Sequence, residues 1–169
     1  YRADAIDTSG IKLVVNERHA QTGELASLAC AAERLTGDTV ISYGDLLFRS
    51  YILRDLAESE AEFSVVVDSS LTEPTNQSVR DFALCSAADD RGLFGQKTYL
   101  QRVSSDVATG TPHGRWIGLL NVRGAGVDRL KAMLATLQAR DDFDTLDIPM
   151  LLNELIAAGE KIEVQYVHG

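Results

Sequence analysis

A β-favouring run leads directly into a Gly-Asp pair in the stretch Thr39-Val40-Ile41-Ser42-Tyr43-Gly44-Asp45-Leu46-Leu47-Phe48. A helical pattern follows, so Asp45 is expected just beyond the carboxyl end of a strand. In an open α/β sheet, ligands bind outside the carboxyl ends of the strands. A carboxylate in this position can bind a Mg²⁺ ion that accompanies phosphate groups, and Gly44 lets the backbone approach closely. The stretch therefore predicts an α/β sheet with a phosphate-handling site at one end.

Strand and helix patterns alternate on both sides of this stretch, which is typical of α/β proteins. The run from Phe63 to Asp68 is almost continuously apolar, as expected for a strand covered on both faces, and it too ends on a carboxylate. Asp147 is a candidate helix N-cap, and Gly159 lies just past the end of the same helix. We expect strands at 11–16, 40–43, 63–68, 82–85, 98–103, 115–122 and 161–167, and helices around 25–35, 52–56, 127–137 and 148–156.

The middle of the chain is less regular. From Ser69 to Gly95 turn-forming residues surround one weak strand. Long loops in compact domains are often functional, so we expect this segment at the carboxyl edge of the sheet, on the same side as Asp45. The strands at 98–103 and 115–122 are joined by a polar segment and are expected to pair antiparallel.

Composition narrows the classes of protein that fit. The chain has 169 residues with 45% hydrophobic content, enough for a single domain with a core. Its net charge of −9 repels a phosphate backbone, which disfavours nucleic acid as a partner. We find no run long enough for a membrane helix and no leading signal peptide, so no membrane partner is expected. Cys30 and Cys85 lack metal-ligand spacing and are expected to be buried hydrophobes in a reducing cytoplasm.

Several motifs together resemble the nucleotidyltransferase family, which includes sugar-phosphate nucleotidyltransferases. The similarity covers nearly the whole chain, and its nearest version is the cytidylyltransferase domain of phosphonate pathways, which is often fused to phosphoenolpyruvate mutase. The segments that carry the resemblance are Asn16 with Gln21–Leu28, Tyr43-Gly44-Asp45, Val65–Ser70, Gly114–Leu119, Asp147–Asn153 and Val164–Gly169.

This resemblance implies a fold and an activity. The expected fold is a three-layer α/β domain over residues 1–169, with a mainly parallel Rossmann-like sheet and an antiparallel insertion. The implied reaction is Mg²⁺-dependent transfer of a nucleotidyl group, CMP from CTP, to 2-aminoethylphosphonate or another small phosphonate or phosphate. A sugar-1-phosphate acceptor is the alternative within the enzyme class. A non-catalytic interaction module that keeps the fold is the alternative outside it.

The resemblance also implies roles for particular residues. Asp45 would be the catalytic metal ligand. Nucleotide contacts are implied for Asn16, Thr22, Gly23, Ser27 and Gly44, and acceptor contacts for Asp68, Arg91, Trp116 and Gly118.

Each of these assignments has a plainer alternative. In the alternative interpretation, Asp45 caps a turn or helix, Asp68 ends a strand and Trp116 fills the core, and none of them contacts a ligand. His19, His113 and His168 are isolated in the sequence and are expected in surface or structural roles.

Two family elements are not matched by these residues. The family begins with a Gly-rich phosphate loop that carries a Lys, and it ends with a His-Trp-x-Asp motif that supplies a second metal ligand. Tyr1-Arg2-Ala3-Asp4 resembles the residues that follow the first of these elements. We therefore expect that the missing central strands come from another polypeptide segment, as in a homo-oligomer, or that they exist in the molecule outside these 169 residues.

Overall fold

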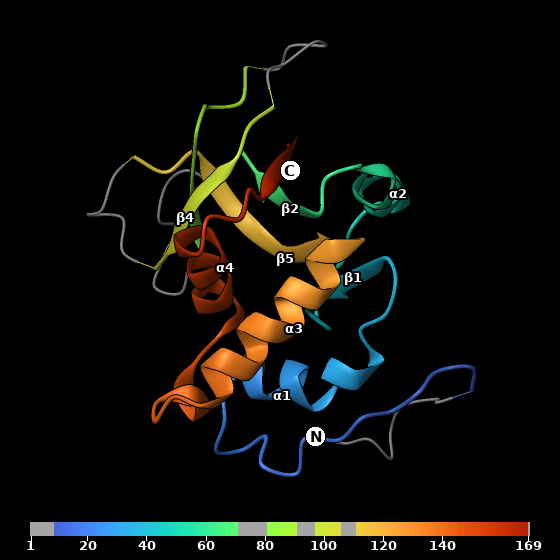
Figure 1. Ribbon diagram of the computed structural model, residues 1–169. Helices are drawn as coiled ribbons and strands as arrows, with labels where there is room; N and C mark the ends of the chain where they lie inside the picture. The colour runs from blue at the N-terminus through green and yellow to red at the C-terminus, as the bar shows by residue number, and fades with distance from the viewer. Residues whose placement is uncertain (1–8, 71–80, 91–96, 106–110, 169) are drawn as a thin grey trace.

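The computed structural model describes residues 9–70, 81–90, 97–105 and 111–168, and within them six strands form one sheet. Four helices pack on this sheet, and two short 3₁₀ turns accompany them (Figure 1). The strands are β1 (Thr39–Ser42), β2 (Phe63–Asp68), β3 (Phe82–Cys85), β4 (Leu100–Ser104), β5 (Gly114–Val122) and β6 (Glu163–Val167). The helices are α1 (Glu24–Cys30), α2 (Ser50–Glu58), α3 (Ala125–Gln138) and α4 (Ile148–Ala157), with 3₁₀ turns η2 (Ala32–Arg34) and η4 (Phe143–Thr145).

The predicted α/β class is confirmed, but the strands of the sheet run mostly antiparallel rather than mainly parallel. The order is β4-β3-β5-β2-β6, and β1 also pairs with β5. Among the strands of the described residues, only β2 and β6 pair in parallel. The central strand β5 is antiparallel to β1, β2 and β3, so this one strand accounts for most of the antiparallel pairing.

Two of the expected strand arrangements are wrong. Residues 11–16 form no strand, and their apolar side chains stay outside the core, with Ile11 and Val15 each 55% exposed. The strands at 98–103 and 115–122 do not pair with each other either. Strand β3 lies between them, because its buried Phe82 and Ala83 pair with β4 on one side and with β5 on the other.

Helix α4 forms as the sequence predicts. The Asp147 carboxylate accepts a hydrogen bond from the Met150 backbone amide at 2.9 Å, which satisfies an N-terminal donor of the helix. Gly159 follows the helix with φ 95°, the left-handed conformation that commonly ends helices. Of the two free cysteines, Cys85 is buried as expected, whereas Cys30 is exposed on α1. Among the described residues, no helix is both long and apolar enough to cross a membrane.

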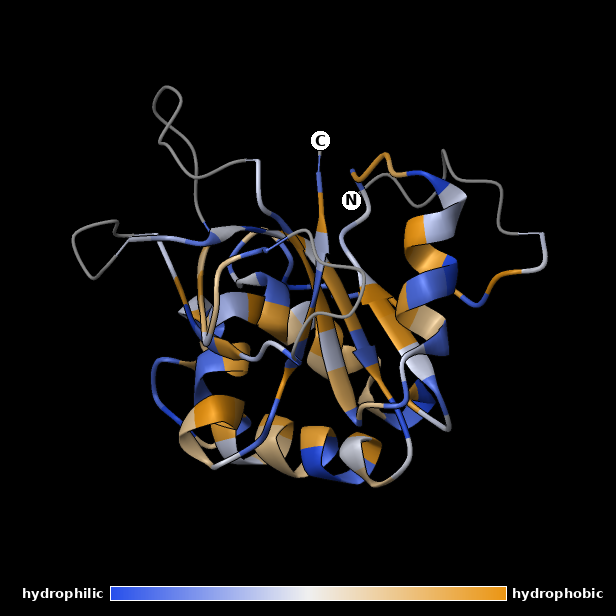
Figure 2. Cartoon of the chain, turned by 90° about the horizontal axis from the view of Figure 1, so that it is seen from above, coloured by the Kyte–Doolittle hydropathy of each residue, from blue (hydrophilic) through white to orange (hydrophobic). Residues whose placement is uncertain are grey.

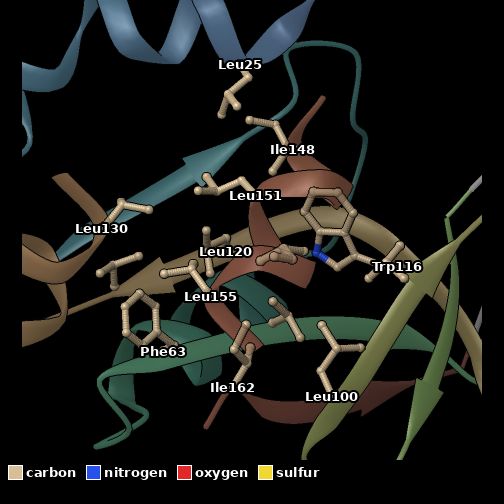
Figure 3. Close-up of a cluster of buried hydrophobic side chains, with 14 of the residues drawn as sticks. Leu25, Phe63, Leu100, Trp116, Leu120, Leu130, Ile148, Leu151, Leu155 and Ile162 are labelled. Atoms are coloured by element: carbon tan, nitrogen blue, oxygen red, sulfur yellow. The ribbon is translucent and has the colours of Figure 1, made fainter. Parts of the chain in front are cut away.

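The two faces of the sheet are covered unequally. Side chains alternate across β5, so Trp116 and Leu120 join the main core beneath α1, α3 and α4 (Figure 3). Leu119 and Ile117 point to the opposite face, where α2 contributes the buried Ile52 and Leu56. Figure 2 shows α2 on the far side of the sheet from α3 and α4. The sheet surface that α2 leaves uncovered becomes the floor of a cleft.

Candidate functional site

The main cleft lies between α2, the turn that follows β1, and the ends of three strands. It has a volume of about 790 Å³. Its floor is made by Asp68 at the end of β2, by Arg115 and Ile117 of β5, and by Val167 at the end of β6. The remaining described residues that line it are Glu24, Tyr43–Arg49, Tyr51, Ile52, Asp81 and Trp116. The Gly44–Asp45 turn and Asp68 therefore line the same cleft.

Tyr43 and Trp116 form the wall between the cleft and the core. Their ring centroids are 5.4 Å apart at an angle of 60°. Trp116 is only 2% exposed, and its Nε1 donates to the Leu119 carbonyl at 2.9 Å, so most of this side chain belongs to the core. Gly118 does not line the cleft; it lies behind Tyr43. Of the two predicted acceptor contacts on β5, only Trp116 reaches the cavity.

The Tyr43 hydroxyl connects this wall to α1. It donates to Oε2 of Glu24 at 2.9 Å. Burial raises the pKa of Tyr43 well above its usual value, and the hydrogen bond to Glu24 raises it further. Tyr43 therefore stays a neutral hydrogen-bond donor, and it holds the Glu24 carboxylate at the edge of the cleft.

Asp45 lies in an exposed turn at the cleft wall. No hydrogen bond or ion pair joins its carboxylate to another residue of the described part of the chain. A hard oxygen donor of this kind suits Mg²⁺, which proteins commonly hold through one or two carboxylates together with substrate phosphates. Among the described residues no three His, Cys, Asp or Glu side chains gather closely enough to hold a metal alone. Asp45 thus fits a metal ion only as one ligand beside a phosphate-bearing substrate.

Two further cleft carboxylates are held firmly. Asp68 is 8% exposed, and its Oδ1 accepts hydrogen bonds from the Ser70 amide at 2.9 Å and the Ser70 hydroxyl at 2.6 Å. Asp81 has φ 76°, an unfavourable backbone conformation for a residue with a side chain, and its carbonyl accepts from the Trp116 amide at 2.9 Å. Non-glycine residues in such conformations cluster at functional sites. The sequence analysis singled out Asp68 but not Asp81.

Arg115 is another cleft residue that the sequence analysis missed. It is the register partner of Asp68 across β2 and β5. No ion pair joins the Arg115 guanidinium to another described residue, although acidic side chains share the cleft. The alternation of β5 could have revealed it, because a residue next to the buried Trp116 must face the other side of the sheet. Arg91, the predicted acceptor contact, lies outside the described residues.

Of the five predicted nucleotide-binding residues, only Gly44 lines the cleft, and the other four lie outside its lining. The Asn16 side-chain amide donates to Thr22 Oγ1 at 2.9 Å and to Ser27 Oγ at 3.0 Å. The Gly23 amide donates to the Asp144 carbonyl at 2.6 Å, which fixes the start of α1 against η4. The structure therefore brings Asn16, Thr22 and Ser27 together, but they do not line the cavity. Glu24, the next residue after Gly23, is the one that reaches it.

The charges in the cleft are mixed. The described lining residues include four carboxylates, on Glu24, Asp45, Asp68 and Asp81, and two guanidinium groups, on Arg49 and Arg115. Arg49 is exposed at the N-cap of α2. A cleft of this composition can bind a ligand that carries both a negative and a positive group. A polyphosphate would need an added cation here, because carboxylates outnumber the arginines.

No family model and no curated protein matches this chain in sequence. Its fold, however, matches solved structures of nucleotidyltransferases. CTP:phosphocholine cytidylyltransferase from Streptococcus pneumoniae matches with a TM-score of 0.57 and 15% identity, over 95% of this chain and 61% of that one. The inositol-1-phosphate CTP transferase from T. maritima matches with a TM-score of 0.61 and 14% identity, over 89% and 54% of the two chains.

A UDP-glucose pyrophosphorylase solved with UDP-glucose matches with a TM-score of 0.58 and 9% identity, over 88% of this chain and 55% of that one. The chain thus spans 54 to 61% of the length of these three structures. At such low identity the likeness shows the fold, which is the α/β fold of nucleotidyltransferases.

Proposed function

We propose that this chain takes part in transfer of a nucleotidyl group from a nucleoside triphosphate to a small acceptor that carries a phosphonate or phosphate. One observation carries the proposal: on a nucleotidyltransferase fold, a single cleft contains the exposed Asp45 carboxylate and the Arg115 guanidinium, neither of which is paired with another described residue. The nucleotide is proposed to be CTP, in keeping with the motifs that resemble cytidylyltransferases.

The charges of the cleft favour 2-aminoethylphosphonate as the acceptor. A guanidinium such as that of Arg115 can bind two phosphonate oxygens through a pair of parallel hydrogen bonds. The carboxylates of Asp68 and Asp81 would bind the ammonium group of the same acceptor. Trp116 would act indirectly, by holding the Tyr43 ring in place at the wall of the cleft. Arg91 and Gly118 remain proposed contributors, Arg91 by direct contact and Gly118 by leaving room for the Tyr43 ring.

A sugar-1-phosphate is the second candidate acceptor, and the match to a UDP-glucose pyrophosphorylase favours it equally at the level of fold. It shares the phosphate group that Arg115 would bind but lacks the ammonium group. The two acceptors therefore differ in their dependence on Asp68 and Asp81.

The reaction needs positioning and charge neutralisation more than proton transfer. An oxygen of the acceptor's phosphonate, already anionic, attacks the α-phosphorus of the triphosphate, and pyrophosphate leaves with the electron pair of the broken P–O bond. Asp45 would hold a Mg²⁺ ion, which offsets the negative charge of the phosphates when bound. Arg115 would fix the attacking oxygen in line, while Asn16, Thr22, Gly23, Ser27 and Gly44 are proposed to form the nucleotide side.

A screen of four radiolabelled nucleoside triphosphates against acceptors tests this function. The acceptors are 2-aminoethylphosphonate, phosphocholine and glucose-1-phosphate, each assayed with Mg²⁺ and with EDTA. We expect a nucleotidyl-acceptor product with CTP and 2-aminoethylphosphonate that EDTA abolishes. Asp81→Asn should weaken use of the amino-phosphonate and leave use of glucose-1-phosphate unchanged. If no pair gives product in the longest protein that contains these residues, the non-catalytic module becomes the better account.

A further inference from the structure

A second cluster of reactive side chains lies at the end of the parallel strands, next to the cleft but not part of it. Ser69 follows β2, His168 follows β6, and Asp89 belongs to the segment after β3. The Ser69 hydroxyl lies 2.8 Å from Asp89 Oδ2 and 2.9 Å from His168 Nδ1. His168 Nε2 lies 3.1 Å from the same Asp89 oxygen. Three residues from three segments thus form a closed ring of contacts.

The contacts of Ser69 and Asp89 show what protonation of His168 changes in this ring. The Ser69 hydroxyl has one hydrogen, and both Asp89 Oδ2 at 2.8 Å and the Val167 carbonyl at 3.3 Å can accept it. The Asp89 carboxylate accepts from Ser69, so Nδ1 of His168 must donate to the Ser69 oxygen. The two N–H bonds of an imidazole point in widely different directions, and Ser69 Oγ and Asp89 Oδ2 are only 2.8 Å apart, so the approach of Nε2 to Asp89 is an ion-pair contact rather than a second hydrogen bond. A protonated imidazolium attracts the Asp89 carboxylate across this contact, and a neutral imidazole does not.

The ring fastens strand ends that supply the cleft floor. The Ser69 amide donates to the Val167 carbonyl at 3.0 Å, which ties the end of β2 to the end of β6. Val167 lies directly before His168, as Asp68 lies directly before Ser69, and both line the cleft. The Tyr166 hydroxyl donates to the Ala87 carbonyl at 2.7 Å, so the segment that carries Asp89 is held to β6 at a second point.

We propose that Ser69, Asp89 and His168 form a proton-dependent clasp that positions the Asp68 and Val167 end of the cleft. With His168 protonated, all three contacts form and the ends of β2 and β6 are locked to the segment after β3. Loss of a proton from His168 opens one side of the ring and loosens this end of the cleft. His168 is a positioning residue, and its role does not depend on which ligand the cleft takes.

Other ionisable groups near the clasp do not give the same response. Burial raises the pKa of Tyr166, and its hydrogen bond with Cys85 adds to the effect, so this phenol stays neutral at physiological pH. Burial also raises the pKa of the Cys85 thiol. Among the described residues, the charged groups at the same sheet end include Asp68, Asp90 and Arg115, beside Asp89 itself. Imidazole is the side chain that ordinarily changes charge between pH 5 and 8.

Amide hydrogen exchange on the ligand-free chain tests the clasp. The reporters are the Ser69 amide, bonded to the Val167 carbonyl, and the Ser86 amide, bonded to the Tyr99 carbonyl. After correction for the intrinsic pH dependence of exchange, we expect protection of the Ser69 amide to fall about threefold between pH 6 and pH 8, the effect of losing one partly exposed ion pair. The Ser86 amide should change less, because its partner lies outside the ring.

Three variants make the test specific. His168→Gln and Asp89→Asn should each lower protection at pH 6 to the wild-type value at pH 8 and remove the pH dependence. His19→Gln, on an exposed turn outside the clasp, should leave the wild-type response intact. His168 is 45% exposed, so its replacement should not prevent folding, which circular dichroism verifies. An unchanged pH response in His168→Gln, or no response in the wild type, would overturn the proposal, whatever the outcome of the nucleotidyl-transfer screen.

Discussion

The backbone of Gly118 lies directly against the aromatic ring of Tyr43. A Cβ atom placed on Gly118 would lie 2.4 Å from Cδ2 of Tyr43, and φ of Gly118 is +85°. The Tyr43 amide also donates to the Gly118 carbonyl at 3.2 Å. Glycine is required here both for its conformation and for the space it leaves, and Gly118 thereby sets the position of the Gly44–Asp45 turn that follows Tyr43.

Gly118→Ala should therefore destabilise the protein by about 2 kcal/mol or more, because it adds backbone strain to a steric clash. Gly44→Ala is the matched control: φ of Gly44 is not in the left-handed region, and a Cβ there would meet nothing within 4 Å. Urea denaturation of both variants measures the difference. Equal unfolding free energies for the two would show that the ring can move away at little cost.

Asp45→Asn should lower Mg²⁺-dependent turnover by about two orders of magnitude or more while leaving stability nearly unchanged. The carboxylate is exposed and makes no hydrogen bond or ion pair with another described residue, so the fold loses little stability without it. Asp55→Asn, an exposed α2 residue outside this cleft, is the control and should keep full activity. Wild-type turnover by Asp45→Asn at saturating Mg²⁺ would remove Asp45 from the proposed metal site.

Arg115→Gln should raise KM for the acceptor at least tenfold and leave KM for the nucleotide nearly unchanged, because hydrogen bonds to charged groups contribute about 1.5–3 kcal/mol. Arg102→Gln on the exposed side of β4 serves as the control. Steady-state kinetics with each substrate varied in turn separates the two constants. A rise in the nucleotide KM alone would place Arg115 on the other substrate.

The raised pKa of the half-buried Tyr43 should make the free energy of unfolding fall at high pH. Burial and the Glu24 hydrogen bond raise the folded-state pKa of Tyr43, whereas the unfolded chain keeps the ordinary phenol value of about 10. Below that value both states bind the proton; above it the unfolded state loses its proton first, so stability declines toward the raised pKa. Tyr43→Phe should make the decline of unfolding free energy above pH 10 shallower. An identical slope in the variant would assign the effect to other groups such as Tyr166.

Local patterns in the sequence predicted much of this fold. The apolar run before Asp68, the helical spacing of α3 and the capped start of α4 each fix their own element, because burial and capping act within one segment. Strand pairing depends instead on which strands compete for an edge. No local signal shows that β3 separates β4 from β5, or that residues 11–16 have no strand to pair with.

Part of the cleft lining could be inferred from the sequence, and part could not. Residues Asp45 and Asp68 follow strands, so their convergence could be inferred from strand direction. Asp81, Glu24 and Arg115 reach the cleft through a turn, a helix start and the alternation of a central strand, none of which marks a ligand contact in sequence. The cluster of Ser69, Asp89 and His168 joins residues up to 99 positions apart, so it could be found only in three dimensions.

The central claim is that the cleft between α2 and the sheet binds the acceptor, and backbone amide NMR during titration with 2-aminoethylphosphonate tests it most directly. We predict saturable shifts at Asp68, Asp81, Arg115 and Ile117, with Arg115→Gln abolishing them and Arg102→Gln leaving them unchanged. Shifts confined to the groove lined by Asp55, Glu58 and Gln165, or no saturable shifts at millimolar ligand, would contradict the account.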